Sequence, residues 1–255
     1  MEYFVHKNSA VRKIWSKGDT ILFIFAGAAA EFALNKAVDW LYFTGRLPSD
    51  PLGRLFSTVS YARKIVFSNS EDALKAIDKI TSIHSAVEND RGAKIPDWAY
   101  RDVLYMLIHY SISSYELMET CLSDADKADV YDVFYRMGTR MNLKDLPITY
   151  TDWKIDRDAH MYHDLKKSDL TVDLFKQYKK HLGSFRYFIL IEGQKLVIPE
   201  IVRNLLGFTK VSAATPLIGL YKFVRIFNAH NIIKSIILPA AYKSEIADLD
   251  VPYHS

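Results

Sequence analysis

Apolar residues recur at intervals of three and four positions along nearly the whole chain, and this period constrains the fold more than any other feature. An α-helix turns once every 3.6 residues, so side chains at this spacing share one face. Within 70–88, the residues that share such a face are Ala73, Ile77, Ile80, His84 and Val87. The pattern predicts an all-α protein whose helices bury their apolar faces against one another.

Capping residues and prolines set the expected helix boundaries. Ser, Asp and Asn side chains accept hydrogen bonds from the first free N–H groups of a helix, and proline fits the first turn because it lacks an N–H there. Ser123 and Asp126 are spaced approximately as a capping box. We expect a short helix capped by Ser9 and further helices over about 19–43, 51–69, 70–88, 97–121, 123–141, from 151, from 171, 199–207 and 216–237. The segment 187–198 allows a β-hairpin or a helix–turn–helix around Glu192-Gly193-Gln194, and we favour the second.

The composition is that of an ordinary globular protein, with 49% hydrophobic and 25% charged residues. Aromatic residues make up 13% of the chain, which favours a large core or an apolar ligand pocket. The net charge of +3 is small and the basic residues are dispersed, so we expect no nucleic-acid partner. Because repeats, low-complexity tracts and linker-like segments are missing, residues 1–255 are expected to form a single domain.

The most apolar stretch, 21–34, is too short and too polar to cross a membrane. Glu31 interrupts it, whereas a membrane span needs about 20 apolar residues, so we expect a buried helix. The segment 216–237 mixes apolar and basic residues and is expected to be a core helix, with contact to a membrane surface as the alternative. Residues 1–17 lack a signal-peptide pattern. Cys121 is the sole cysteine and is expected to be a buried, inert thiol, which suits a cytoplasmic location.

Two pairs of positions invite a functional interpretation. Arg54 and Thr58 are four residues apart, so they lie on one helix face and could together hold a carboxylate, a propionate or dioxygen. The plainer alternative is an exposed arginine beside a helix threonine. His84 lies within an apolar face, where it is either a hydrogen-bonded core residue or a ligand of a haem iron. His109 on the next helix raises the same question.

A third group offers possible metal ligands. His160, His163 and Asp164 lie close together, but their segment is very polar, so a solvated helix face is the expected interpretation. The sequence has no H-E-x-x-H motif, no G-x-S-x-G motif, no glycine-rich phosphate loop and no cysteine pair. Zinc proteases, serine hydrolases and nucleotide-binding enzymes of the usual kinds are therefore not indicated.

Four segments in consistent order resemble the haem-dependent rubber oxygenase / MpaB oxygenase family. Residues 47–61 (LPSDPLGRLFSTVSY) resemble its "dP-x-x-R-x-x-x-T" helix, and 83–87 (IHSAV) resemble its "H-x-x-V" helix. Residues 107–111 (LIHYS) are similar to "W-V-H-A-T", and 197–207 (VIPEIVRNLLG) to "LLP-x-x-x-R-x-x-L-G". The resemblance spans roughly residues 19–207.

The resemblance implies a helical fold with a globin-like core around b-type haem. His84 falls on the iron-ligand position, with Ile80 and Val87 beside it against the haem, and Arg54 and Thr58 fall on the side where oxygen binds. Characterised members cleave carbon–carbon double bonds of isoprenoid chains with dioxygen. The expected function is therefore a haem b oxygenase acting on an apolar, unsaturated substrate. The alternative is a non-catalytic protein of the same fold that holds haem or a lipid. His109 is expected to be a packing residue.

The sequence also departs from the family pattern. A lysine that rubber oxygenases carry just before the threonine is replaced by Ser57, and a histidine found in some members one turn before the iron ligand is replaced by Thr81. Glu88 or Asn89 stands where MpaB-type members have a glycine. An acidic residue on the preceding helix has two possible counterparts, which are Glu31 and Asp39. These departures leave rubber itself unsupported as the substrate.

Overall fold

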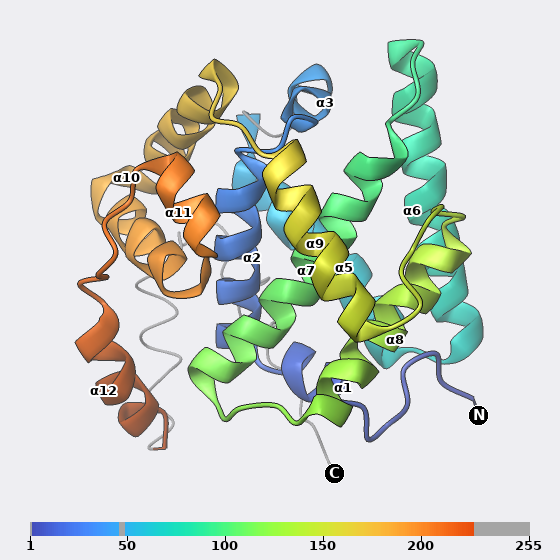
Figure 1. Cartoon of the computed structure of the whole chain (residues 1–255), viewed down its shortest axis with the longest axis horizontal. Coiled ribbons are helices and arrows are strands. Elements are labelled where there is room, and N and C mark those ends of the chain that lie inside the picture. Colours follow the sequence, from blue (N-terminus) through green and yellow to red (C-terminus); the bar gives the residue numbers. More distant parts are fainter. Residues whose placement is uncertain (1, 46–48, 227–255) are drawn as a thin grey trace.

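The computed structural model describes residues 2–45 and 49–226, and every regular element in this part of the chain is a helix (Figure 1). Extended backbone in this part of the chain pairs in isolated antiparallel β-bridges, between Tyr3 and Asn69 and between Asn35 and Leu165. The helices are α1 (Ala10–Trp15), α2 (Gly18–Phe32), α3 (Val38–Phe43), α5 (Pro51–Phe67), α6 (Ser70–Arg91), α7 (Asp97–Met118), α8 (Asp124–Arg140), α9 (Tyr150–Asp164), α10 (Asp169–Val197), α11 (Glu200–Leu206) and α12 (Thr215–Ile226). The all-α prediction is confirmed, whereas the globin-like arrangement and the single domain stay expectations.

The predicted start signals act locally, as their chemistry requires. The Asp50 carboxylate accepts a hydrogen bond from the Gly53 N–H, and Pro51 occupies the first turn of α5. Ser123 and Asp126 form the capping box of α8. Helix α6 begins at residue 70, as expected, but its cap is Asn69 and not Ser70, because the Asn69 side chain accepts the hydrogen bond from the Asp72 N–H.

The expected single helix over 19–43 is wrong, since the chain turns between α2 and α3. Asn35 accounts for the break: its side-chain oxygen accepts a hydrogen bond from the N–H of Ala37, and its amide nitrogen donates to Asp102. A side chain that binds its own neighbouring backbone offers an alternative to the helical hydrogen bonds. The backbone N–H of Lys36 also donates to the carbonyl of Asp164, which attaches this turn to the end of α9.

The turn expected at Glu192-Gly193-Gln194 is also wrong, as is the alternative hairpin, because α10 runs through these residues to Val197. The helix kinks earlier, at Gly183, whose φ of 74° and ψ of 166° lie outside the helical region. Such a conformation is open almost exclusively to glycine. Buried Glu192 accepts hydrogen bonds from Ser212 and Ala213, so this part of α10 is held to the segment before α12.

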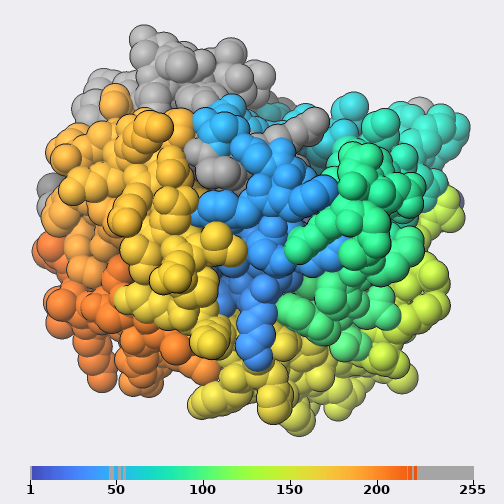
Figure 2. All heavy atoms as spheres, turned by 90° about the horizontal axis from the view of Figure 1, so that it is seen from above, coloured from blue at the N-terminus to red at the C-terminus, as the bar shows by residue number. Residues whose placement is uncertain are grey.

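Helix α2 occupies the centre of the molecule, with α10 to α12 on one side and α5 to α9 on the other (Figure 1). From above, the blue segment that includes α2 and α3 lies between the gold helix α10 and the green residues near 100 (Figure 2). Gly27 allows the close approach of α2 to α7, because an added Cβ would lie 2.3 Å from the ring of Tyr110. The expectation that residues 21–34 form a buried helix is confirmed at Ile21, Ile24 and Ala30, all of which are closed to solvent.

Two further expectations concern surfaces. Cys121 lies exposed in the connection between α7 and α8, so the prediction of a buried thiol is wrong. Among the residues that the structure describes, none of the helices is both long enough and apolar enough to span a bilayer. The expected helix 216–237 begins as α12, and its part beyond Ile226 lies outside the described residues.

Candidate functional site

A large cavity lies between α2, α5, α6, α7, α8, α10 and α12, with a volume of about 1480 Å³. Small-molecule sites usually enclose roughly 300–1,000 Å³. Most of the lining side chains are aliphatic or aromatic, and they include Phe23, Phe32, Val103, Leu107, Phe134 and Leu196. The cavity is therefore large enough for a prosthetic group together with an apolar substrate.

Helix α6 contributes one continuous face to both the core and the cavity. Its first half buries Ala73 and Ile77 completely, whereas its second half directs Ile80, His84 and Val87 into the cavity lining. The helical period explains this division, because all five residues recur at three- and four-residue steps. The shared face expected from the sequence is thus present. The roles of Ile80, His84 and Val87 toward a haem stay predictions.

His84 is half-buried, and its ring meets the edge of the Tyr100 ring at 65°, with the ring centres 5.2 Å apart. Tyr100 lies on α7 and also lines the cavity. The Tyr100 hydroxyl donates a hydrogen bond to the Glu88 carboxylate, 3.2 Å away. Burial of the phenol, followed by the charge of Glu88 and this hydrogen bond, raises the pKa of Tyr100 well above its ordinary value. Tyr100 therefore stays a neutral ring against which the imidazole of His84 packs.

Helix α5 supplies a second set of predicted residues to the same cavity. Ser57 and Thr58 both line it, and Thr58 is half-buried. Arg54 lies one turn earlier on α5, but its side chain is outside the described part of the structure. The structure therefore places Thr58 and His84, from neighbouring helices, on one apolar cavity, and it leaves the position of the Arg54 guanidinium as a prediction.

Glu31 and Asp39 are the possible counterparts of the family's acidic residue, and neither is among the described residues that line this cavity. Glu31 is fully buried and forms a bidentate ion pair with Arg157, with both N–O distances 2.5 Å, and it accepts a hydrogen bond of 2.8 Å from Tyr110. Asp39 is partly exposed and pairs with Arg91 at 2.6 Å. Both carboxylates are therefore engaged elsewhere.

Other carboxylates reach the cavity lining, and the sequence motifs did not single them out. They are Asp19, Asp90 and Glu192. Asp19 accepts hydrogen bonds from the Thr20 N–H at 2.8 Å and from the Tyr221 hydroxyl of α12 at 3.4 Å. Burial would raise the pKa of Glu192, but hydrogen bonds from Lys195, Ala213 N–H and Ser212 outweigh burial and lower it. Tyr221 and Ala213 lie far along the chain from Asp19 and Glu192, so the local sequence could not show these contacts.

His109 is not among the described residues that line the cavity. Its ring packs edge-on against Tyr110 at 4.9 Å between ring centres. Burial and the positive charge of Arg157 outweigh the charge of Glu31 and lower the pKa of His109 to about 4. The residue is therefore neutral at physiological pH and lies in a packed environment, as the sequence pattern led us to expect.

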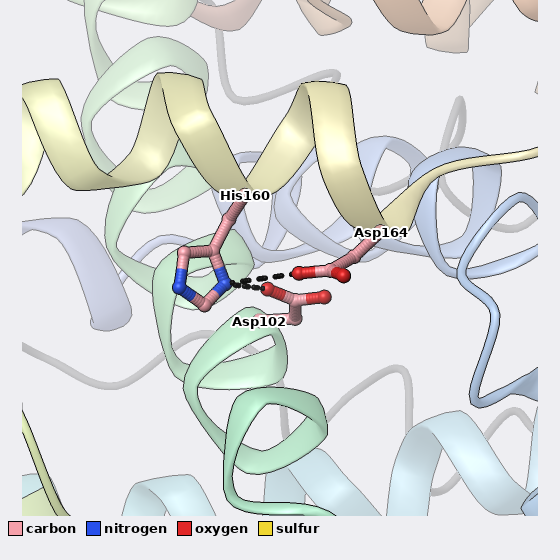
Figure 3. A group of neighbouring side chains, drawn as sticks. All are labelled: Asp102, His160 and Asp164. Carbon is pink, nitrogen blue, oxygen red and sulfur yellow. Dashed lines mark hydrogen bonds and ion pairs between the residues drawn. The ribbon is translucent and has the colours of Figure 1, made fainter.

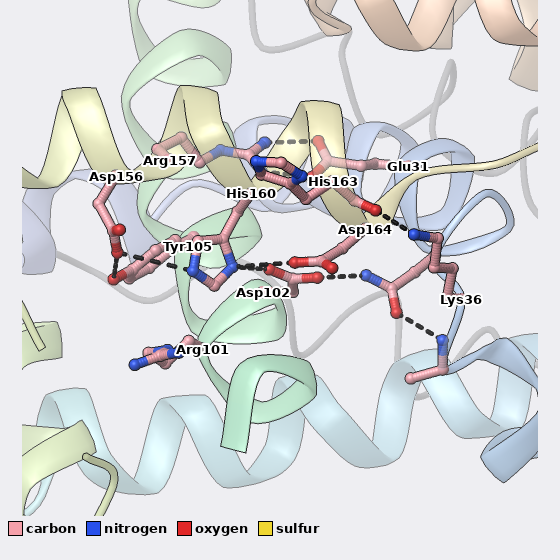
Figure 4. A network of polar contacts seen from close by, with 12 residues as sticks. Glu31, Lys36, Arg101, Asp102, Tyr105, Asp156, Arg157, His160, His163 and Asp164 are labelled. Atoms are coloured by element: carbon pink, nitrogen blue, oxygen red, sulfur yellow. Dashed lines mark hydrogen bonds and ion pairs between the residues drawn. The ribbon is translucent and has the colours of Figure 1, made fainter. Parts of the chain in front are cut away.

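The histidines of α9 do not share one environment. The interpretation of His160 as part of a solvated face is wrong: its side chain is only 11% exposed, and its Nδ1 atom lies 2.5 Å from Asp102 of α7 and 3.3 Å from Asp164 (Figure 3). His163 is exposed, and its backbone carbonyl accepts a hydrogen bond from the Lys36 ammonium (Figure 4). The helical spacing of His160 and Asp164 was visible in the sequence, whereas Asp102 on another helix was not.

Comparison with known proteins gives one match. The family described as "ER-bound oxygenase mpaB/B'/Rubber oxygenase, catalytic domain" matches residues 15–228, which include every helix from α2 to α12. Searches of curated proteins and of solved structures returned no match. The family match contains the segments 47–61, 83–87, 107–111 and 197–207 on which the resemblance rested, and it covers most of the chain. The chain therefore belongs to the family of ER-bound oxygenase mpaB and rubber oxygenase catalytic domains.

Proposed function

We propose that this protein is a haem b-dependent oxygenase that acts on an apolar, unsaturated substrate. His84 would bind the haem iron, and Arg54 and Thr58 would face the side where dioxygen binds. The observation that carries the proposal is that His84 and Thr58 line the same apolar cavity, although they come from different helices. Membership of an oxygenase family supports the reaction class.

The residues present suit a b-type haem. Imidazole is a common axial ligand of haem iron, and an apolar pocket suits the faces of a porphyrin. Ile80 and Val87 precede and follow His84 by four and three residues, so they lie on the same face of α6 and line the same cavity. A macrocycle held by His84 would therefore have aliphatic side chains on either side of its ligand. The volume of about 1480 Å³ leaves space for an apolar substrate beside it.

A bound haem would supply the activation of dioxygen, and the chain would set the polarity around it. The Thr58 hydroxyl can donate a hydrogen bond into the cavity, and the Arg54 cation can bind either an anionic oxygen or a haem propionate. The surrounding aliphatic and aromatic side chains exclude water and favour an apolar substrate over a polar one. The carboxylates of Asp19 and Glu192 also line the cavity, and both accept hydrogen bonds from backbone N–H groups.

The second candidate is a non-catalytic haem- or lipid-binding protein of the same fold. One observation favours it: Ser57 lines the cavity at the position where rubber oxygenases carry a lysine. A hydroxyl cannot supply the positive charge of that lysine toward a bound oxygen. The two candidates predict the same cavity and differ in turnover.

Oxygen consumption by the haem-loaded protein, supplied with a short isoprenoid, distinguishes the two candidates. An oxygenase consumes oxygen and cleaves the double bond, and a binding protein does neither. The variant Thr58→Val keeps the shape of the side chain and removes its hydroxyl, so we expect turnover to fall about tenfold or more while the haem spectrum is retained. Ser60→Ala, at an exposed position of the same helix, is the matched control and is expected to keep full turnover. Absence of substrate-dependent oxygen consumption in the wild type would favour the binding protein.

A further inference from the structure

A group of possible metal ligands lies away from the cavity lining, where α9 crosses α7. Asp102 comes from α7, and His160 and Asp164 come from consecutive turns of α9, so that the four-residue spacing places both on one face (Figure 3). Asp102 is 2% exposed, and the side chains of His160 and Asp164 are 11% and 17% exposed. Neighbouring Val103 of α7 lines the cavity, whereas Asp102 faces α9.

The distances between these groups approach those of a metal site. One donor atom from each residue lies within 4.8 Å of the others. Metal bonds of about 2.0–2.2 Å in a tetrahedral site separate neighbouring donor atoms by roughly 3.3–3.6 Å. His160 Nδ1 and Asp164 Oδ2 are 3.3 Å apart and already meet this requirement. His160 Nδ1 and Asp102 Oδ1 are 2.5 Å apart, so a metal ion requires them to separate by about 1 Å.

The groups behind these ligands orient them for such a role (Figure 4). The Asn35 amide donates a hydrogen bond of 2.6 Å to Asp102 Oδ2, which leaves Oδ1 directed at His160. Asp156 lies 3.7 Å from Nε2 of His160, and the Tyr105 hydroxyl holds this carboxylate through a hydrogen bond of 2.6 Å. A metal-bound histidine usually donates its second ring N–H to a carboxylate, a backbone carbonyl or water, and Asp156 is the carboxylate on this side of the ring, beyond direct hydrogen-bond distance.

The charges of this region also favour a cation. The carboxylates of Asp102, Asp156 and Asp164 surround a single imidazole. Of the nearby cations, Arg157 pairs with buried Glu31, whereas the Lys36 ammonium binds the neutral carbonyl of His163 and offsets part of the negative charge near Asp164.

We propose that Asp102, His160 and Asp164 bind a divalent transition-metal ion of the zinc type. One imidazole and two carboxylates are ligands that Zn²⁺ accepts, with a water molecule in the remaining position of a tetrahedral site. The ion joins α7 to α9 on the side of α7 that faces away from the cavity. The proposal is independent of the proposed haem chemistry, because neither the ligands nor their partners belong to the cavity lining.

Zinc binding by the tag-free, full-length protein tests the proposal. The protein is stripped with a chelator and dialysed against buffered Zn²⁺, and its zinc content is measured by elemental analysis. We expect one equivalent of zinc, together with a rise in Tm of roughly 5–10 °C when free Zn²⁺ exceeds the Kd about 100-fold. Asp164→Asn should weaken zinc affinity at least tenfold. His163→Ala, which removes an exposed histidine of the same helix, should retain wild-type affinity.

Two results would overturn the proposal. One is a wild-type protein that takes up no stoichiometric zinc, which would identify the group as a metal-free hydrogen-bonded contact. The other is an Asp164→Asn variant that binds zinc as tightly as the wild type. Asp164→Asn is preferred to a change at Asp102 because it is nearly isosteric and lies at a less buried position, and circular dichroism verifies that the variant is folded. Zinc content is measured without reference to haem or turnover, so a failed oxygenase assay leaves this test unaffected.

Discussion

The ion pair between Glu31 and Arg157 shows how single residues depend on distant partners in this protein. Both side chains are nearly closed to solvent, at 0% and 4% exposure, and their residues lie 126 positions apart in the sequence. Tyr110 of α7 completes the arrangement by donating to Glu31. A buried charge that loses its partner keeps the full cost of its removal from water. The pair therefore ties α2, α7 and α9 together, and its value depends on both partners being present.

The first prediction follows from this dependence. Glu31→Leu or Arg157→Met should each lower the free energy of unfolding by about 3–5 kcal/mol, because each leaves an uncompensated buried charge. The double variant Glu31→Leu/Arg157→Met removes both charges and should be less destabilised than either single variant. Urea denaturation measures all three. A double variant whose loss equals the sum of the two single losses would show that the residues do not act as a pair.

The second prediction concerns the pH dependence of stability and rests on His109. The folded protein has a lowered pKa of about 4 at this residue, whereas histidine in an unfolded chain titrates near 6.5. As the pH falls below about 6.5, the unfolded state therefore gains a proton before the folded state does. The contribution of His109 to stability is present above this pH and is lost progressively down to about pH 4. We expect a loss of up to about 1.4 kcal/mol per pH unit from this residue.

His109→Gln tests this assignment, because glutamine does not titrate. The free energy of unfolding, measured from pH 7 to pH 4, should decline less steeply in the variant than in the wild type. Equal slopes in His109→Gln and the wild type would refute the lowered pKa.

At the level of the elements, local signals predicted the helices well but not where they bend. Asp50 with Pro51, and Ser123 with Asp126, act within a single turn, so the sequence alone located these helix starts. The break after α2 was missed because the Asn35 side chain, which binds the nearby Ala37 N–H, is also held by Asp102, which lies 67 residues away. A hydrogen bond between residues so far apart cannot be recognised from the spacing of apolar and capping residues within one segment.

The glycines of α10 illustrate the same limit and lead to the third prediction. Gly183 has a φ of 74° and forms the kink, whereas Gly193, where the turn was expected, lies within the helix. Gly183→Ala should lower the free energy of unfolding by about 1–3 kcal/mol, because alanine rarely adopts this conformation. Gly193→Ala should be neutral or stabilising by up to about 1 kcal/mol, since the closest atom to its added Cβ is on Phe23 at an ordinary 3.5 Å. Thermal denaturation of the two variants measures the contrast, and equal effects would contradict the kink assignment.

At the scale of the whole molecule, the cavity and the α7–α9 ligand group could not be predicted from local patterns. The cavity lining comes from many helices, and the group at His160 needs Asp102 from a second helix. The family resemblance nevertheless selected Thr58 and His84, and the fold places both on the same cavity. The order of the motifs along the chain thus selected two residues that share a cavity, and their role as a site stays a prediction.

The visible absorption spectrum of the protein reconstituted with haem b tests directly whether His84 binds the haem iron. We predict a Soret band with one haem per chain, lost or strongly weakened in His84→Ala and retained in His109→Ala. His84 is half-buried at the cavity lining, so its truncation should leave the fold intact, which circular dichroism checks. A wild-type protein without a Soret band, or a His84→Ala variant that binds haem as well as the wild type does, would show that His84 is not the ligand of a haem iron.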